Sequence, residues 1–470
     1  TAELNTAYGF TALDAITTGD RNTAMGYAAG TSINTGIENT LIGGLAGDAL
    51  TTGNYNVAIG KSALSTSLDG DHNTAIGVYA LEDYEDGDGN GFNTAVGSQS
   101  QAQATTGEFN TSLGASSMGV GVTTGDYNVA LGYAAGNAIT SGQRNILIGG
   151  NAGDALTTGE SNVAIGHGAL SAEDTTGSTT AIGYKALNLQ NAAAESYNVA
   201  VGFEAGKAVT TGIKNTLIGS EAGVALTVGN YNTVLGYGAL NASVDGDYNT
   251  AIGFQALLAY EDGDGNGHNT AVGASSQTSA TTGEFNTSLG SLSMGSGVTT
   301  GDGNTVLGYS AGLAITSGAE NVLIGSNAGD ALTTGYFNVG IGHEALSTED
   351  GHGYNVAVGH HALRVQNAGA DAYNTAVGYS AGAAVTTAIK NTIIGGLAGD
   401  ALTEGSSNVA IGYGAMSSAN GTESRNIAIG QFALFQLNDN GNNYNTAVGY
   451  AAGENITTGI KNTLLGGLAG

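Results

Sequence analysis

Two short segments carry acidic and amide side chains at alternate positions, a spacing that could bind a metal ion. Each segment ends in a glycine, Gly91 in the first copy and Gly267 in the second. Oxygen ligands at alternate positions before a glycine are typical of the first half of a calcium-binding loop. The candidate ligands are Asp86, Asp88, Asn90, Asp262, Asp264 and Asn266.

The second half of a calcium loop is missing from both segments. Glycine (Gly97 and Gly273) stands where the closing bidentate glutamate would be expected. Ligands from neighbouring parts of the chain would therefore have to complete a Ca²⁺ site. The alternative interpretation is an exposed acidic turn, and no other cofactor is expected.

The seven histidines show none of the spacings that are typical of zinc sites. His360 and His361 are adjacent, and in a strand they would point to opposite faces. We therefore expect no histidine metal site. No segment departs from the regular pattern of the chain in the way that a catalytic cleft would require, so we also expect no enzymatic activity.

A repeated pentad must position all of these residues. Asparagine, then Thr, Val or Ile, then a small or aliphatic residue, then an apolar residue and glycine recur from Asn5 to Asn462. Thr179 alone replaces the asparagine. Most pentads start seventeen positions after the previous one, and the remaining intervals are one to three positions longer. We number each repeat, or coil, from this first residue.

Self-similarity at this period indicates a solenoid, because one coil cannot bury its apolar face without a neighbouring coil. A shift of ten coils superimposes the chain on itself, carrying Asn22 onto Asn198 and Asn198 onto Asn374. We therefore expect one continuous β-solenoid over residues 1–470. It contains the blocks 22–197 and 198–373 and a partial third block, 374–470.

The coil length predicts the local structure. Seventeen residues at about 3.3 Å each give a perimeter of roughly 56 Å, which suits two short strands and two turns. The first strand covers the pentad, because positions 2 and 4 are β-branched or apolar. The second is expected around position 8, which is always Ala or Ser. The fold class is thus all-β, a parallel β-roll of about 27 coils.

Position 3 holds only small or aliphatic residues, such as Ala58 and Leu147, although it should point opposite to positions 2 and 4. A strand that is apolar on both faces is expected to be buried on both. We predict that the face carrying position 3 packs against other chains, with a three-fold axis favoured. The alternative is a monomer in which position 3 lines the core and position 2 faces solvent.

Two further columns should run along the stack. The asparagine side chains can hydrogen-bond from coil to coil. The residue before the asparagine is often aromatic, as at Tyr55 and Phe109. We expect these rings to stack at the spacing of the coils.

The composition excludes several partners. The chain has 10 Lys and Arg against 39 Asp and Glu, a net charge of −29. Nucleic acid is excluded as a partner because its phosphates require clustered cations, and anionic membrane surfaces are disfavoured for the same reason. No apolar run is long enough for a membrane helix. With no cysteine the chain forms no disulfide, and with no proline it keeps every backbone donor of the sheet.

The pentads Asn-Thr-Ala-Ile-Gly and Asn-Val-Ala-Ile-Gly, as at 73–77 and 162–166, resemble the YadA-like head repeats of trimeric autotransporter adhesins. Related repeats occur in phage tail fibres. The resemblance covers essentially the whole chain. It implies a left-handed parallel β-roll in which three chains form a rigid head or shaft. The coil of seventeen or more residues is longer than the repeat of that family.

Together these features predict an extracellular fibrous protein at a cell or virion surface. Its first partner is itself, and its second a surface receptor or glycan bound through the variable turns. The alternatives are the subunit of an end-to-end extracellular filament or sheath, and a phage tail-fibre shaft.

Overall fold

A computed structural model of the chain describes residues 1–85, 90–261 and 267–470. The described residues form no helix, and every coil contributes one three-residue strand at positions 2 to 4. The fold is an all-β parallel solenoid of 27 strands. Its residues fall into two compact units, Thr1–Tyr231 and Asn232–Gly470.

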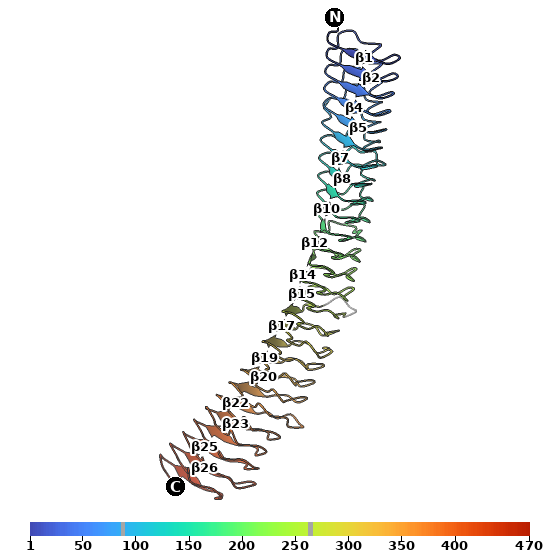
Figure 1. Ribbon diagram of the computed structural model, residues 1–470. Helices are drawn as coiled ribbons and strands as arrows, with labels where there is room; N and C mark the ends of the chain where they lie inside the picture. The colour runs from blue at the N-terminus through green and yellow to red at the C-terminus, as the bar shows by residue number, and fades with distance from the viewer. Residues whose placement is uncertain (86–89, 262–266) are drawn as a thin grey trace. The chain divides into compact units, whose positions relative to one another are not determined.

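The first unit contains thirteen coils, whose strands lie one above another (Figure 1). They are β1 (Thr6–Tyr8), β2 (Thr23–Met25), β3 (Thr40–Ile42), β4 (Val57–Ile59), β5 (Thr74–Ile76), β6 (Thr94–Val96), β7 (Thr111–Leu113), β8 (Val129–Leu131), β9 (Ile146–Ile148), β10 (Val163–Ile165), β11 (Thr180–Ile182), β12 (Val199–Val201) and β13 (Thr216–Ile218).

The second unit repeats the same arrangement. Its strands are β14 (Thr233–Leu235), β15 (Thr250–Ile252), β16 (Thr270–Val272), β17 (Thr287–Leu289), β18 (Thr305–Leu307), β19 (Val322–Ile324), β20 (Val339–Ile341), β21 (Val356–Val358), β22 (Thr375–Val377), β23 (Thr392–Ile394), β24 (Val409–Ile411), β25 (Ile427–Ile429), β26 (Thr446–Val448) and β27 (Thr463–Leu465).

Within each unit, consecutive strands pair in parallel and in register, so each coil position lies on the same position of the next coil. Val57 pairs with Thr74, for example, and Ala58 with Ala75. The asparagine at position 1 holds this register from inside. The backbone N–H of Asn56 donates to Oδ1 of Asn39 at 2.9 Å, and its own Nδ2 donates to the carbonyl of Gly70 at 2.6 Å. The predicted asparagine column is confirmed.

The prediction about position 3 is wrong. The middle residue of the strand points into the coil, where Ala58, Leu147 and Leu323 have no exposed surface. Positions 2 and 4 point outward and are partly or fully exposed in every strand, while position 3 is buried in all strands except the terminal β1 and β27. Side chains alternate along a strand, so position 3 lies on the same side as the buried asparagine at position 1. The alternative orientation, with position 3 in the core, is the one observed.

The second predicted strand is also absent from the described residues. The segment around position 8 is a turn, because positions 7 and 9 adopt left-handed backbone angles in coil after coil. Ser62 has φ of 52° and Leu64 has φ of 54°. This segment still bonds to its neighbours: the N–H of Leu64 donates to the carbonyl of Ala80 in the next coil at 3.0 Å. A side chain in this conformation costs roughly 1–2 kcal/mol, which stacking must offset.

The glycine at position 5 sets how closely the coils approach. Gly43 has φ of +136°, and a Cβ added there would lie 2.4 Å from the carbonyl oxygen of Gly60 in the next coil. The neighbouring Gly44 has an ordinary φ, and its nearest atom would lie 3.9 Å away. Only glycine fits position 5, for both conformational and steric reasons.

We expect the substitution Gly43→Ala to lower the free energy of unfolding by at least about 2 kcal/mol, from the strained φ and the clash with the next coil. The matched control Gly44→Ala should stay within about 0.5 kcal/mol of the parent chain. Urea unfolding followed by circular dichroism measures both. Equal effects at the two positions would contradict this account of the glycine column.

Candidate functional site

The outward residues of the strands form an uncharged strip in each unit, which we call the outer stripe (positions 2 and 4 of each coil). Position 2 is Thr, Val or Ile in every coil, and position 4 is always apolar. Many of these side chains are well exposed; Leu113, Ile146 and Leu235, for example, are 52%, 40% and 46% exposed. The position 4 column is an apolar strip beside a position 2 column that is mostly threonine. An exposed apolar strip of this kind is typical of an interaction surface.

Rings at the residue before the asparagine stack from coil to coil, as predicted. We call this column the first aromatic ladder. In the first unit it contains five consecutive rings with centroids 4.6–5.2 Å apart and nearly parallel planes. They are Tyr55, His72, Phe92, Phe109 and Tyr127. In the second unit Tyr248, His268 and Phe285 stack in the same way.

Rings at position 6, two residues after the end of each strand, form a second aromatic ladder. His167, Tyr184 and Phe203 stack with centroids 5.8 Å and 5.3 Å apart. Tyr237 and Phe254 pair at 5.8 Å. The sequence prediction missed this ladder, although the recurrence of rings at position 6 could have revealed it. The two ladders flank the outer stripe in every coil that carries both rings.

The ring geometry limits what the ladders can bind. In the middle of the long stack both faces of a ring are covered by the rings of adjacent coils, yet Phe92 and Phe109 remain 43% and 40% exposed. The exposed part is therefore mainly ring edge. A flat ligand cannot stack within such a column, whereas a second apolar surface can pack along its edges.

The candidate calcium ligands lie mostly outside the described residues. Asp86, Asp88, Asp262, Asp264 and Asn266 belong to the ranges 86–89 and 262–266, and the Ca²⁺ prediction stays a prediction. Asn90 is described, and it pairs with Asp71 of the preceding coil in an isolated parallel bridge.

The prediction that the histidines cannot chelate from one face is wrong. His360 and His361 follow β21 in the turn and do not lie in a strand. Their ring centroids are 3.8 Å apart, and the ring of His343 from the preceding coil lies 5.1 Å and 5.7 Å from them. One ligand atom from each of the three lies within 4.8 Å of the others. His343 and His360 both occupy position 6 of consecutive coils. This spacing of one coil could have predicted from the sequence that the two rings lie side by side.

Two charged side chains, Glu344 and Arg364, lie beside this histidine cluster. Nε2 of His361 is 3.1 Å from Oε2 of Glu344, and the same carboxylate lies 3.9 Å from Nη1 of Arg364. Burial lowers the pKa of His361 below its ordinary value, and the neighbouring His360 adds to this shift, while Glu344 opposes it. The imidazole of His361 is thus held toward its neutral form.

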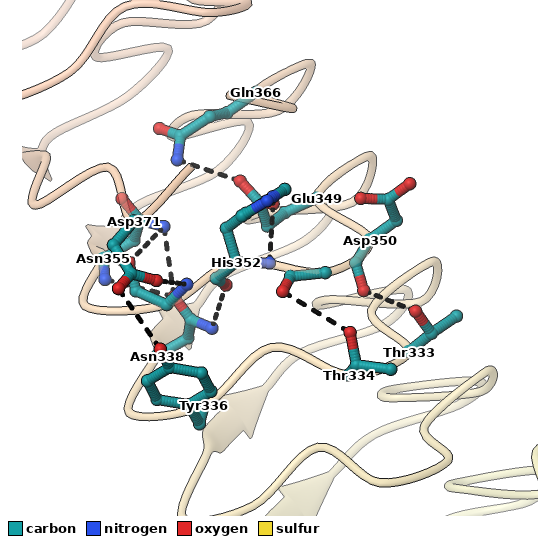
Figure 2. A network of polar contacts seen from close by, with 12 residues as sticks. Thr333, Thr334, Tyr336, Asn338, Glu349, Asp350, His352, Asn355, Gln366 and Asp371 are labelled. Atoms are coloured by element: carbon teal, nitrogen blue, oxygen red, sulfur yellow. Dashed lines mark hydrogen bonds and ion pairs between the residues drawn. The ribbon is translucent and has the colours of Figure 1, made fainter. Parts of the chain in front are cut away.

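A second polar group, around Glu349, has a structural explanation (Figure 2). Glu349 and Gln366 occupy the interior position 12 of successive coils, and Nε2 of Gln366 donates to Oε2 of Glu349 at 3.0 Å. The backbone N–H of His352 donates to Oε1 at 3.2 Å. Ligand atoms of Glu349, Asp350 and His352 lie within 4.8 Å of one another, so this group could also hold a metal ion.

The same contacts occur ten coils earlier without a histidine. There Gln190 donates to Glu173 at 3.1 Å, and the backbone N–H of Thr176 donates to Glu173 at 3.0 Å. The buried carboxylate therefore closes the turn of its coil in both blocks. Burial raises the pKa of Glu349 above its ordinary value of 4.5, and hydrogen bonds from Gln366 and His352 oppose the shift.

Removing one ring from the middle of the first ladder should destabilise the stack. Phe92→Ala loses contacts with His72 and Phe109, and we expect a loss of about 1–3 kcal/mol in unfolding free energy. Tyr133→Ala is the matched control, because the residues one coil away at its position are Ala115 and Gly150. It should change stability by less than about 0.5 kcal/mol. Equal losses in urea unfolding would argue against ring stacking as a source of stability.

The buried Glu349 should make stability depend on pH. The folded state holds its proton more tightly than the unfolded chain, so the parent protein loses stability as pH rises above about 4.5. Glu349→Gln removes this term, and the melting temperature of the variant relative to the parent should rise between pH 4 and pH 7. The exposed Glu320→Gln serves as the control. A difference that stays constant or falls with pH would contradict the assignment.

No pocket is present within residues 1–85, 90–261 and 267–470, and none of these residues forms a helix able to cross a membrane. Comparison with known protein families and with curated proteins found no match for the chain.

Proposed function

We propose that the protein is an extracellular fibrous protein of structural or adhesive type, built from β-solenoid coils that associate with further copies of the same chain. One observation carries this proposal: the outer stripe bears no charged side chain in any coil, although the chain has a net charge of −29. An uncharged stripe with an apolar column at position 4, on a strongly acidic chain, is best explained as an interface.

A second copy is the partner that fits this stripe best. Its side chains repeat at the spacing of parallel strands, about 4.8 Å, and a partner with the same repeat can match it over many coils. The stacked ring edges beside the stripe add apolar area. A three-fold arrangement, in which each chain presents its stripe toward a common axis, closes the assembly without leaving a stripe in water.

The turns that follow position 9 are the proposed contact with the environment. All changes in coil length fall in this half of the coil, so its surface can vary without disturbing the strands. A surface receptor or glycan would bind there. The stack itself would provide stiffness and spacing.

Sedimentation analysis of the soluble protein tests the self-association. We expect a mass that is a multiple of 46.2 kDa, and a shift to the monomer in the double variant Leu113→Lys, Ile146→Lys. Both side chains are exposed in the single chain, so lysine is tolerated there unless another chain covers them. The control Ser141→Lys, Thr158→Lys makes the same charge change at exposed turn positions.

Salt provides a second readout, because like-charged copies repel one another. The Debye length falls from about 30 Å at 0.01 M salt to about 8 Å at 0.15 M, so association should strengthen over this range. A monomeric parent chain at both salt concentrations would overturn the proposal. So would a control variant that dissociates as readily as the stripe variant.

A further inference from the structure

The turn after β21 brings three imidazoles together, and we propose that His343, His360 and His361 form a binding site for a divalent transition-metal ion such as Zn²⁺. The site belongs to two successive coils. His343 and His360 are exposed and His361 is partly exposed, so an ion can reach them from solution.

The donor set suits this class of ion. Neutral imidazole nitrogen binds zinc, copper and nickel well, whereas calcium and magnesium prefer oxygen. The three ligand atoms already lie within 4.8 Å of one another. Bonds of about 2.0–2.1 Å from zinc to nitrogen would draw these atoms closer together, which requires the exposed side chains of His343 and His360 to rotate from their stacked arrangement.

Glu344 gives the site its outer support. Its carboxylate lies 3.1 Å from Nε2 of His361, which leaves the other ring nitrogen, Nδ1, available to the ion. A carboxylate that accepts a hydrogen bond from a ligating histidine fixes the orientation of its ring and makes it a stronger ligand. Arg364, at 3.9 Å from the same carboxylate, partly neutralises it.

The repeat itself provides a natural comparison. The equivalent positions ten coils earlier hold His167, Tyr184 and Lys185, with Gly168 in place of Glu344. His167 and Tyr184 stack there at 5.8 Å as part of the second ladder. Two of the three imidazoles and the supporting carboxylate are therefore missing from that block. Stacking needs only the ring at position 6, so it does not account for His361 or Glu344.

The second residue group around Glu349 is the rival site nearby. Its carboxylate is already engaged by Gln366 and by the backbone of His352, as in the block without a histidine. We assign the ion to the three imidazoles. The variant His352→Thr, which copies Thr176, distinguishes the two groups.

Equilibrium dialysis of tag-free protein against Zn²⁺ tests the proposal. The parent chain should bind about one equivalent more than the double variant His360→Tyr, His361→Lys, and His352→Thr should bind as the parent does. The double variant copies Tyr184 and Lys185, and Lys185 adopts φ of 52° at this position, close to the 60° of His361. It should therefore keep its fold, which circular dichroism checks.

Bound Cu²⁺ gives an independent readout. Its electron paramagnetic resonance spectrum should show coupling to several nitrogens in the parent chain and lose that coupling in the double variant. Equal Zn²⁺ binding by the parent and the folded double variant would overturn the proposal. Loss of the extra equivalent in His352→Thr would overturn it as well, because it would place the ion at Glu349.

Discussion

The close approach of neighbouring coils at position 5 is the constraint on which the rest of the structure depends. A methyl group at Gly43 would sit 2.4 Å from the next carbonyl oxygen, so the column admits no side chain. This approach lets the position 1 amides hydrogen-bond from coil to coil and brings the rings before them into stacking distance. The same contacts offset the left-handed backbone of positions 7 and 9, which an isolated coil could not sustain.

The in-register stacking also keeps uncharged and charged side chains in separate columns on the surface. Because each position lies on its own equivalent, one apolar residue per coil becomes an apolar column. The outer stripe and the −29 net charge thus coexist on one chain without mixing. A small change at a single coil position can then create a local feature, as His360 and His361 do beside His343.

The pentad predicted the number of coils, the parallel strand and the asparagine column, because these follow from spacing alone. It did not reveal which face is inside, since none of positions 2, 3 and 4 carries a charged side chain and each is mostly β-branched or apolar. The face could have been found from position 1, because side chains two residues apart in a strand lie on the same face and the asparagine at position 1 is buried. The left-handed angles at Ser62 and Leu64 could not be read from residues that favour other conformations. The histidine cluster was missed because its members were compared along the chain and not across one coil.

The in-register stacking has a consequence for how such a chain can evolve. A whole coil removed or duplicated by unequal recombination leaves the same positions facing one another, so the new junction resembles every other junction. Loss of one residue within positions 1 to 9 would instead shift the asparagine, the glycine and the left-handed turns out of line with the next coil. We expect natural variants to differ by complete coils or by residues after position 9. The ten-coil block that repeats from Asn22 to Asn198 is such a change on a larger scale.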